Sequence, residues 1–285
     1  MYENINIPVS VKEQFDISGR VAIITGGGGF LGLQFSEAIS EMGGIPILID
    51  NNRDLLQKNE AKLDQFGCKQ YNSYISDVTD EKSCINTIDQ INSDFSRIDI
   101  LINCAALTKS GIEDKNKEYF TSFEKLDQKL WDAGLKINLT GTQIMCKLVG
   151  TYMANKGKGS IINIASEIGI ISPDQRIYQS DDSGYKGVNF NSPAFYAVSK
   201  AGVIHLTKFL STIWAEKNVR VNSISPTGVY RHHDPGFVKK LSQCIPMGRM
   251  ALPNEFKGAI AYLSSDASSF VTGHNLIIDG GRTIW

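Results

Sequence analysis

The chain has 285 residues, of which 42% are hydrophobic and 21% charged, a composition typical of a globular protein with one large core. Its 29 basic and 30 acidic side chains give a formal net charge of −1, which favours neither nucleic acid nor a membrane surface as a partner. We therefore expect a small polar molecule as the partner. Five widely spaced cysteines favour a reducing cytoplasm and argue against a metal site.

Short β-branched runs alternate with longer amphipathic segments along the chain. We expect strands at residues 20–25, 45–50, 70–75, 98–103, 160–165, 219–224 and 275–279. We expect helices near residues 30–42, 53–66, 80–96, 123–156, 193–217 and 254–265. This alternation predicts an α/β fold with a single Rossmann-type, doubly wound parallel sheet and helices on both faces. Residues 1–285 then form one domain, with an N-terminal extension at 1–14 and a long loop at 167–192.

Four consecutive glycines follow the first expected strand, in the segment RVAIITGGGGFLGLQF at residues 20–35. Gly27, Gly29 and Gly32 have the G-x-G-x-x-G spacing of a dinucleotide-binding turn. In such a turn one glycine permits the tight bend, another lets the backbone approach a pyrophosphate, and a third lets helix and strand pack closely. The N–H groups at the start of the next helix can also bind phosphate. The segment therefore predicts a dinucleotide cofactor.

A carboxylate at the end of the second expected strand bears on which cofactor is bound. Asp50 can accept hydrogen bonds from both hydroxyls of the adenosine ribose and would repel a 2′-phosphate, which favours NAD over NADP. Arg53 is close enough in the sequence to keep NADP as an alternative. Asp50 could also be the N-cap of the following helix, a role that is compatible with ribose binding.

Several short motifs occur in an order that resembles the short-chain dehydrogenase/reductase family, from about Phe15 to the C-terminus. They are FDISGRVAIITGGGG (15–29), DVTD (77–80), NCAA (103–106), INLTGT (137–142), IINIASEIG (161–169) with YAVSK (196–200), ISPTGVY (224–230) and VTGHNLIIDGG (271–281). The resemblance implies an oxidoreductase that acts on CH–OH groups with a nicotinamide cofactor, and a homodimer or homotetramer.

The chain departs from the common family pattern at three positions. The usual short-chain glycine motif would place glycine at Phe30, whereas the string here fits the Thr25-Gly26-x-x-Gly29-x-x-Gly32 form of extended members. Thr227 stands where the family usually has glycine, and Arg231 stands where a threonine often contacts the carboxamide. The resemblance is therefore weakest around the nicotinamide.

The resemblance also assigns the catalytic side chains, which are Asn138, Ser166, Tyr196 and Lys200. Tyr196 would be the general acid and base. A free tyrosine, with a pKa of about 10, is a poor base at neutral pH. Lys200 lies four residues further on the same helix face and can stabilise the phenolate. By resemblance, Lys200 also holds the nicotinamide ribose, Ser166 binds the substrate oxygen, and Asn138 positions Lys200 through water.

The expected cofactor contacts lie in the loops that follow the strands and on the catalytic helix. They are Thr25, Gly26, Gly27, Gly29, Phe30, Leu31, Gly32, Asp50, Asn51, Asp77, Val78, Asn103, Ala105, Tyr196, Lys200, Pro226, Gly228 and Val229. We expect the catalytic helix to begin with Ser192 as N-cap and Pro193 at its first position.

The segment between Ser166 and Tyr196 is longer than in most short-chain members, and both of its ends carry expected catalytic residues. Its charged and polar content favours a hydroxylated or charged substrate, although a solvated surface excursion is the alternative. We expect substrate contacts from Ser166, Glu167, Arg176 and Arg231. SPDQRIYQ (172–179) and DGGRTIW (279–285) further resemble a subgroup of bacterial sugar-pathway enzymes that includes flagellin modification proteins.

These features together predict an NAD(H)-dependent oxidoreductase that interconverts an alcohol and a ketone on a polar, carbohydrate-like substrate. An amino-sugar or sugar-phosphate in the synthesis of a glycan precursor would fit the subgroup. One alternative is an NADPH-dependent 3-oxoacyl thioester reductase, which Asp50 and the polar insertion disfavour. The other is a catalytically idle NAD-binding partner protein, which the complete set of Asn, Ser, Tyr and Lys disfavours.

Overall fold

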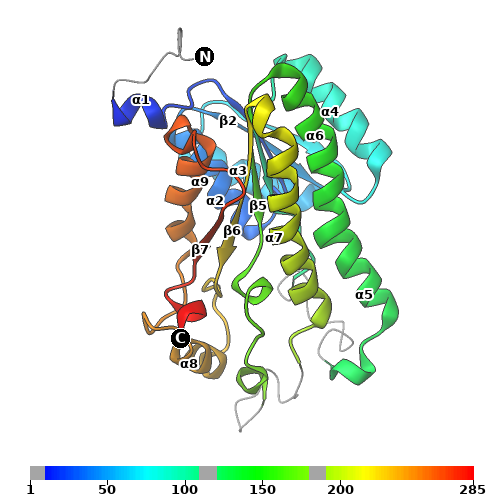
Figure 1. Cartoon of the computed structure of the whole chain (residues 1–285), viewed down its shortest axis with the longest axis vertical. Coiled ribbons are helices and arrows are strands. Elements are labelled where there is room, and N and C mark those ends of the chain that lie inside the picture. The colour runs from blue at the N-terminus through cyan, green and yellow to red at the C-terminus, as the bar shows by residue number, and fades with distance from the viewer. Residues whose placement is uncertain (1–9, 109–120, 180–190) are drawn as a thin grey trace.

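A parallel sheet forms the centre of the computed structural model, which describes residues 10–108, 121–179 and 191–285 (Figure 1). All of the strands expected from the sequence are present, and the expected fold class is confirmed. The strands are β1 (Val21–Thr25), β2 (Ile45–Asp50), β3 (Asn72–Ile75), β4 (Ile100–Asn103), β5 (Gly159–Ile164), β6 (Val219–Pro226) and β7 (Asn275–Ile278). Part of the N-terminal extension and part of the 167–192 loop lie outside the described residues.

The strand order explains where a ligand can bind. The strands lie in the order β3-β2-β1-β4-β5-β6-β7, and every neighbouring pair is parallel. The chain therefore runs outward in one direction from β1 to β3 and in the other direction from β4 to β7. In parallel α/β sheets a ligand-binding crevice lies at such a switch point, which here falls outside the carboxyl ends of β1 and β4.

Alternate side chains of each strand pack against opposite helical layers. Val21 and Ile23 contribute to a core with residues of α4 (Glu81–Phe95) and α6 (Thr142–Lys156), whereas Ala22 and Ile24 pack with residues of α2 (Phe30–Glu41) and α9 (Lys257–Ser264). Each strand of this central region is buried on both faces, as a parallel sheet requires. The helices are α1 (Val11–Phe15), α2 (Phe30–Glu41), α3 (Arg53–Phe66), α4 (Glu81–Phe95), α5 (Gln128–Leu135), α6 (Thr142–Lys156), α7 (Ala194–Trp214), α8 (Pro235–Gln243) and α9 (Lys257–Ser264).

The long helix expected at 123–156 runs without a break from Gln128 to Lys156, so it begins five residues later than expected, and it contains a π-helical segment. Residues Phe123–Lys125 form a separate 3-10 turn, and α5 begins only after Asp127, whose side chain accepts a hydrogen bond from the Lys129 N–H at 2.8 Å. Between α5 and α6 the chain widens into a π-helical segment, Lys136–Gly141. Asn138 in this segment binds the backbone of Leu107 through both its Oδ1 (2.6 Å) and its Nδ2 (3.3 Å). A wide turn that holds a buried polar side chain is common at functional sites.

Two other helix boundaries differ from expectation. Pro193, rather than Ser192, is the N-cap of α7, and the Ser192 N–H donates instead to Gln175 Oε1 at 2.9 Å. Helix α8 was not expected, because its pattern is short. Its sequence signal is nevertheless present, since Asp234 accepts a hydrogen bond from the Phe237 N–H at 3.1 Å and Pro235 is the first helical residue.

Candidate active site

The glycine turn lies between β1 and α2, at the switch point of the sheet. Gly26 has a φ of +67°, and a Cβ added to it would lie 2.8 Å from the Cα of Ala105. A Cβ on Gly32 would lie 2.3 Å from the carbonyl oxygen of Gly26. Glycine is therefore required at Gly26 by conformation and contact, and at Gly32 by the close packing of α2 against the turn.

The start of α2 is suited to an anion. Gly29 is the N-cap and provides no side-chain hydrogen bond, and the first turn, which begins with Phe30 and Leu31, contains no acidic residue. Gly27 donates its N–H to the Ile49 carbonyl at 3.0 Å, which fixes the turn against β2. The first backbone N–H groups of α2 and the positive end of its helix dipole therefore lie beside the crevice, and no side chain caps this end of α2. This cradle fits the pyrophosphate of a dinucleotide.

Thr25 joins the carboxyl ends of the two central strands. Its Oγ1 accepts hydrogen bonds from the N–H groups of Cys104 (3.1 Å) and Ala105 (3.2 Å). Asn103, the last residue of β4, donates its Nδ2 to Asn163 Oδ1 at 2.9 Å. The Oδ1 of Asn103 is buried without a hydrogen-bond partner among the described residues. Thr25 therefore supports the floor of the crevice, and Asn103 retains one free buried acceptor there.

Asp50 ends β2 beside the glycine turn. Its Oδ2 accepts a hydrogen bond from the Gly28 N–H at 3.1 Å, and its Oδ1 accepts one from the Asn52 N–H at 3.0 Å. Burial raises the pKa of this carboxyl, and the hydrogen bonds from Asn52 and Gly28 oppose that effect. The N-cap of α3 is Asn52, not Asp50, because Asn52 Oδ1 accepts the Leu55 N–H at 3.0 Å. Asp50 therefore remains available to a ribose.

The other expected cofactor positions lie around the same crevice edge. Asn51 is exposed, whereas Val78 is buried against Gly141. Asp77 precedes α4 and accepts the Thr79 N–H at 2.8 Å. Pro226 is the last residue of β6, Gly228 accepts a hydrogen bond from the Ala251 N–H at 3.1 Å, and Val229 pairs with Ala251. These contacts fix the loops that follow β3 and β6.

Ser166, Tyr196 and Lys200 are brought together at the carboxyl end of β5. Ser166 follows β5 and caps the 3-10 turn Glu167–Gly169, whereas Tyr196 and Lys200 lie one turn apart on α7. The Nζ of Lys200 is 5.6 Å from the centre of the Tyr196 ring. Ser166 lies close enough to the Tyr196 phenol to lower its pKa. The arrangement expected from the YAVSK motif is therefore present in the structure.

Burial controls the ionisation of this cluster. Burial of the Tyr196 phenol raises its pKa, the negative charge of Glu167 raises it further, and the nearby Ser166 hydroxyl opposes both effects. Burial lowers the pKa of Lys200 to about 8. Lys200 is 3% exposed and donates from Nζ to the Ile164 carbonyl at 2.6 Å. The free protein therefore holds Tyr196 as a neutral phenol, and a nearby cation is needed to make it a base.

Asn138 contacts the catalytic helix directly, through Ser199. Its Nδ2 donates to Ser199 Oγ at 3.2 Å, and Ser199 Oγ donates to the Tyr196 carbonyl at 2.9 Å. Asn138 is 1% exposed and Ser199 is fully buried. Asn138 thus ties the π-helical segment to the turn of α7 that lies between Tyr196 and Lys200.

The expected substrate residues fall in separate places. Glu167 is buried and paired with Arg282, with 3.1 Å between Oε1 and Nη1. Arg231 is exposed, and its guanidinium carbon lies 5.0 Å from the centre of the Phe30 ring, above the start of α2. Arg176 is paired with Asp174 at 2.7 Å and lines a surface hollow of about 500 Å³.

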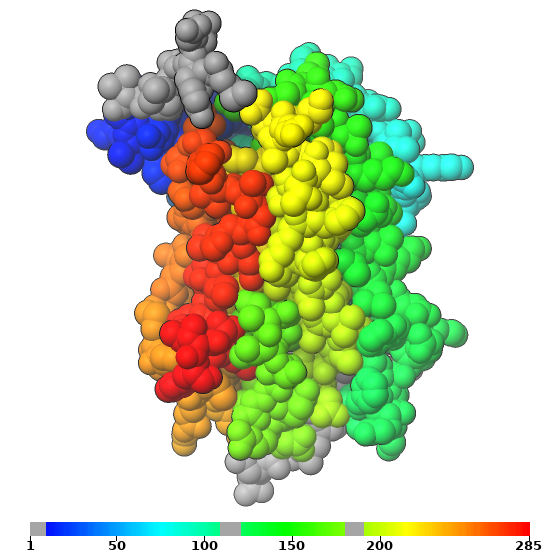
Figure 2. All heavy atoms as spheres, in the orientation of Figure 1, coloured from blue at the N-terminus to red at the C-terminus, as the bar shows by residue number. Residues whose placement is uncertain are grey.

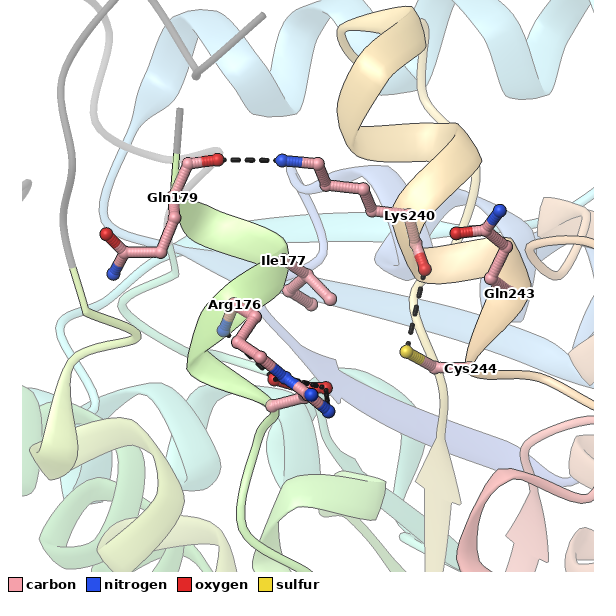
Figure 3. Close-up of a pocket in the computed structure, with 7 residues that line it drawn as sticks. Arg176, Ile177, Gln179, Lys240, Gln243 and Cys244 are labelled. Atoms are coloured by element: carbon pink, nitrogen blue, oxygen red, sulfur yellow. Dashed lines mark hydrogen bonds and ion pairs between the residues drawn. The ribbon is translucent and has the colours of Figure 1, made fainter. Parts of the chain in front are cut away.

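The hollow that contains Arg176 is formed by the segment before residue 180 and by α8 (Figure 3). Lys240 of α8 lies across it and donates to the Gln179 carbonyl at 2.8 Å. Ser166, Glu167, Tyr196 and Arg231 are not among the residues that line it. The structure therefore does not bring Arg176 together with the catalytic cluster. The remaining charged residues of the insertion, at 181, 182 and 186, lie outside the described residues.

Comparison with known proteins agrees with this geometry. A family model, adh_short_C2, described as enoyl-(acyl carrier protein) reductase, matches residues 30–283. The D-threitol dehydrogenase of Mycolicibacterium smegmatis is 32% identical over 97% of each chain. The NADP-dependent mannitol dehydrogenase of Hypocrea jecorina is 32% identical over 94% of each chain. The crystal structure of NAD⁺-bound xylitol dehydrogenase has a TM-score of 0.79 and 30% identity, and covers 93% of this chain and 99% of its own.

A sheet with this switch point, cradle and Tyr–Lys pair defines an enzyme of nicotinamide-dependent redox chemistry. The chain belongs to the short-chain dehydrogenase/reductase family and is an oxidoreductase of CH–OH groups. Its relatives include both NAD- and NADP-dependent enzymes. Within the described part of the chain, no helix is both long and apolar enough to cross a membrane.

Proposed function

We propose that the protein is an NAD(H)-dependent oxidoreductase that interconverts a secondary alcohol and a ketone on a polyol or sugar-like substrate. The observation that carries this proposal is the cluster at the carboxyl end of β5, in which Ser166 lies beside Tyr196 and the Nζ of Lys200 lies 5.6 Å from the centre of the Tyr196 ring. Bound NAD would accept or return a hydride at the substrate carbon. Tyr196 would take or return the hydroxyl proton, and Ser166 would hold the substrate oxygen.

Residues of the crevice support the cofactor assignment. Gly26, Gly29 and Gly32 with the N–H groups of α2 would hold the pyrophosphate, and Asp50 would bind the ribose hydroxyls. The 2′-phosphate of NADP would meet the Asp50 carboxylate, so we assign NAD as the preferred cofactor. Lys200 would hold the nicotinamide ribose and stabilise the Tyr196 phenolate.

The substrate class is supported by the names of the relatives, which include threitol, glycerol and mannitol dehydrogenases and a sorbose reductase. The narrower resemblance to flagellin-modification enzymes stays a prediction from SPDQRIYQ and DGGRTIW. Both possibilities involve a substrate with several hydroxyl groups.

A substrate panel tests the proposal directly. Purified protein is assayed with NAD⁺ and with NADP⁺ against threitol, glycerol, xylitol and mannitol, and against amino-sugars and sugar phosphates. We expect turnover of at least one of these compounds, with a higher kcat/KM for NAD⁺. Reduction of a 3-oxoacyl thioester with NADPH alone would favour the acyl reductase instead. Tight NADH binding with no turnover of any compound would favour a catalytically idle partner protein.

We also propose a homodimer or homotetramer. The helix α7 carries exposed apolar side chains at Val198, Phe209 and Ile213, which are 48%, 59% and 51% exposed. Apolar side chains gathered on one helix favour burial against another copy of the chain. Light scattering of the purified protein should give two or four times the chain mass of 31.4 kDa, and a monomer would contradict the proposal.

A further inference from the structure

A buried carboxylate lies beside Ser166 and has no role in the chemistry assigned so far. Glu167 is 5% exposed, and its Oε2 accepts a hydrogen bond from Ser166 Oγ at 2.9 Å. Its Oε1 lies 3.1 Å from Nη1 of Arg282. An ionised carboxyl at this depth is tolerated only when it is paired and hydrogen-bonded. Glu167 satisfies both conditions, with one oxygen turned to the serine and the other to the arginine.

The C-terminal turn places the guanidinium. Gly281 has a φ of +91° and precedes the 3-10 turn Arg282–Ile284. Asp279 accepts hydrogen bonds from the N–H groups of Gly281 (2.9 Å) and Thr283 (2.7 Å), which closes the turn. Figure 2 shows the red C-terminal segment against the light-green segment that follows β5, and Figure 1 shows the same arrangement. The Arg282 side chain is consequently buried, with 5% exposed.

Thr227 joins the same group from a third segment. It stands where the family usually has glycine, and its Oγ1 donates to Glu167 Oε1 at 3.4 Å. Its N–H donates to the Ile278 carbonyl at 3.1 Å, which fixes it against β7. Thus two features that set the sequence apart, the SPTG motif and the DGGRTIW terminus, converge on the carboxylate next to Ser166.

The hydrogen of the Ser166 hydroxyl is committed to this carboxylate. A serine hydroxyl has one hydrogen to donate and two lone pairs that can accept. Ser166 donates its hydrogen to Glu167 Oε2, and its Oγ accepts the Ile168 N–H at 3.4 Å. Ser166 is 7% exposed, so water has little access to these bonds. The second lone pair of Ser166 Oγ can accept a hydrogen bond from a ligand, but Ser166 has no hydrogen left to donate to one.

The number of hydrogens on the substrate then identifies the donor. In the proposed reaction the reacting hydroxyl gives its single hydrogen to Tyr196, so it has none for Ser166. A hydrogen bond to Ser166 Oγ therefore needs a second hydroxyl on the substrate. Because Ser166 lies beside the Tyr196 phenol, this hydroxyl belongs on the carbon next to the reacting one. Donation to a carboxylate also polarises the serine oxygen and makes it a stronger acceptor.

On the basis of the proposed function, we propose that Glu167 is a specificity-determining residue, which keeps Ser166 as a hydrogen-bond acceptor and thereby selects vicinal diols as substrates. Arg282 and Thr227 are positioning residues, because both donate to Oε1 and leave Oε2 for the serine. A substrate with a single hydroxyl, or with an ether in place of the second one, leaves the Ser166 lone pair without a donor. Polyols and sugars contain the required pair of neighbouring hydroxyls.

The first test compares two substrates of the wild-type protein with NAD⁺. They are propane-1,2-diol and 1-methoxypropan-2-ol, in which a methyl ether replaces the second hydroxyl and can accept a hydrogen bond but cannot donate one. We expect kcat/KM to be at least about tenfold higher for the diol, since a site built to bond a hydroxyl rejects an analogue that lacks it. Equal values for the two compounds, or no oxidation of the diol, would overturn the inference.

The same two substrates test the role of Glu167. In Glu167→Gln the amide oxygen should face Arg282 and Thr227, because both are donors, so the amide NH₂ should face Ser166 Oγ. The Ser166 hydrogen is then free to point to the substrate, and the diol-to-ether ratio of kcat/KM should fall at least about tenfold. This ratio cancels a general loss of activity, and comparison with the wild type cancels the added bulk of the methyl group. An unchanged ratio in Glu167→Gln would overturn the inference.

Variants of Arg282 keep the carboxyl, so they also serve if Glu167→Gln does not fold. Arg282→Met removes the charge that lowers the pKa of Glu167, so the buried carboxyl should take up a proton and donate it in a hydrogen bond to Ser166. The diol-to-ether ratio should fall at least about fivefold, whereas Arg282→Lys should stay within about twofold of the wild type because it keeps a cation. Arg249→Met, at an exposed ion pair with Glu255, is the matched control. A wild-type ratio in Arg282→Met would overturn the inference.

The outcomes separate this inference from the proposed function. If the wild-type protein shows no turnover on the substrate panel, the proposed function fails and the specificity assigned to Glu167 fails with it. If the wild type oxidises a polyol and requires Tyr196, but its diol-to-ether ratio is close to one or is the same in Glu167→Gln, only the specificity assigned to Glu167 fails.

Discussion

The guanidinium of Arg231 lies over the ring of Phe30, with 5.0 Å from its central carbon to the ring centre. Phe30 is the first residue of α2, and Arg231 belongs to the segment between β6 and α8. The contact therefore links the loop that follows β6 to the helix start where we place the pyrophosphate. A cation at this position adds to the positive end of the helix dipole.

This relationship predicts that Arg231 contributes to cofactor binding through charge. Arg231→Ala should raise the Kd for NADH by about fivefold, since a partly exposed cation–phosphate contact contributes on the order of 1 kcal/mol. Fluorescence titration of NADH at low and high salt measures the effect, which should shrink at high salt. Arg249→Ala, which removes an arginine from an exposed ion pair, is the control. An unchanged Kd in Arg231→Ala would show that the charge of Arg231 does not act on the bound cofactor.

The carboxylate of Asp50 should determine the preference for NAD. Asp50→Ser removes the charge that a 2′-phosphate would meet, while a hydroxyl remains to bond with the ribose. We expect the ratio of kcat/KM for NADP⁺ to that for NAD⁺ to rise at least about tenfold, which corresponds to a repulsion of about 1.4 kcal/mol. Asp54→Ser, in the first turn of α3, is a nearby control. A wild-type enzyme that already prefers NADP⁺ would contradict the assignment.

The close packing at the glycine turn predicts a loss of stability when a methyl group is added. Gly32→Ala would place a Cβ 2.3 Å from the Gly26 carbonyl oxygen, so the backbone of the turn must move. We expect the free energy of unfolding to fall by about 1–3 kcal/mol, with weaker NADH binding. Gly258→Ala in α9 meets no atom within 4 Å and should stabilise the protein by up to about 1 kcal/mol. Urea denaturation measures the free energy of unfolding of both variants, and equal values would contradict the packing argument.

The burial of Lys200 predicts a pH dependence of stability. Its pKa is about 8 in the folded chain, against 10.5 for an ordinary lysine, so the unfolded chain binds more protons between these values. The contribution of Lys200 to the free energy of unfolding therefore increases as the pH rises from about 8 to 10.5. The total change is on the order of 3–4 kcal/mol, because one pKa unit corresponds to about 1.4 kcal/mol.

Urea denaturation of Lys200→Met across this pH range measures the effect. The stability of the wild-type protein relative to this variant should increase with pH. Lys147→Met, at a lysine whose side chain is 59% exposed, is the matched control. If the free energies of unfolding of the wild type and of Lys200→Met differ by the same amount at every pH, the Lys200 ammonium is better solvated than the structure indicates.

The sheet was predictable because its strands consist of short, buried, β-branched runs that differ plainly from the amphipathic helices. Strand β2 and helix α3 begin and end at the residues expected for them. The π-helical segment between α5 and α6 was not predictable, because it accompanies the contact of Asn138 with the backbone of Leu107. The N-cap of α7 was misassigned for a similar reason, because the Ser192 N–H donates to the side chain of Gln175, 17 positions earlier in the chain.

Within the candidate site, Ser166, Tyr196 and Lys200 could be found from motifs because their spacing along the chain reflects one strand end and one helix face. Glu167 was expected to contact substrate, whereas the structure pairs it with Arg282, 115 positions away. A single sequence contains no signal that joins two such residues. Thr227 was visible as a departure from the family pattern, but its contact with Glu167 required the fold.

The central claim is that Tyr196 transfers the proton in an oxidation of an alcohol at this site. The most direct measurement compares kcat of the wild-type protein and of Tyr196→Phe for a polyol that the wild type oxidises with NAD⁺, with NADH binding measured in parallel. Because the phenol oxygen is removed and the ring is kept, we expect kcat to fall at least about a hundredfold while the Kd for NADH changes little. Full turnover by Tyr196→Phe would contradict the account.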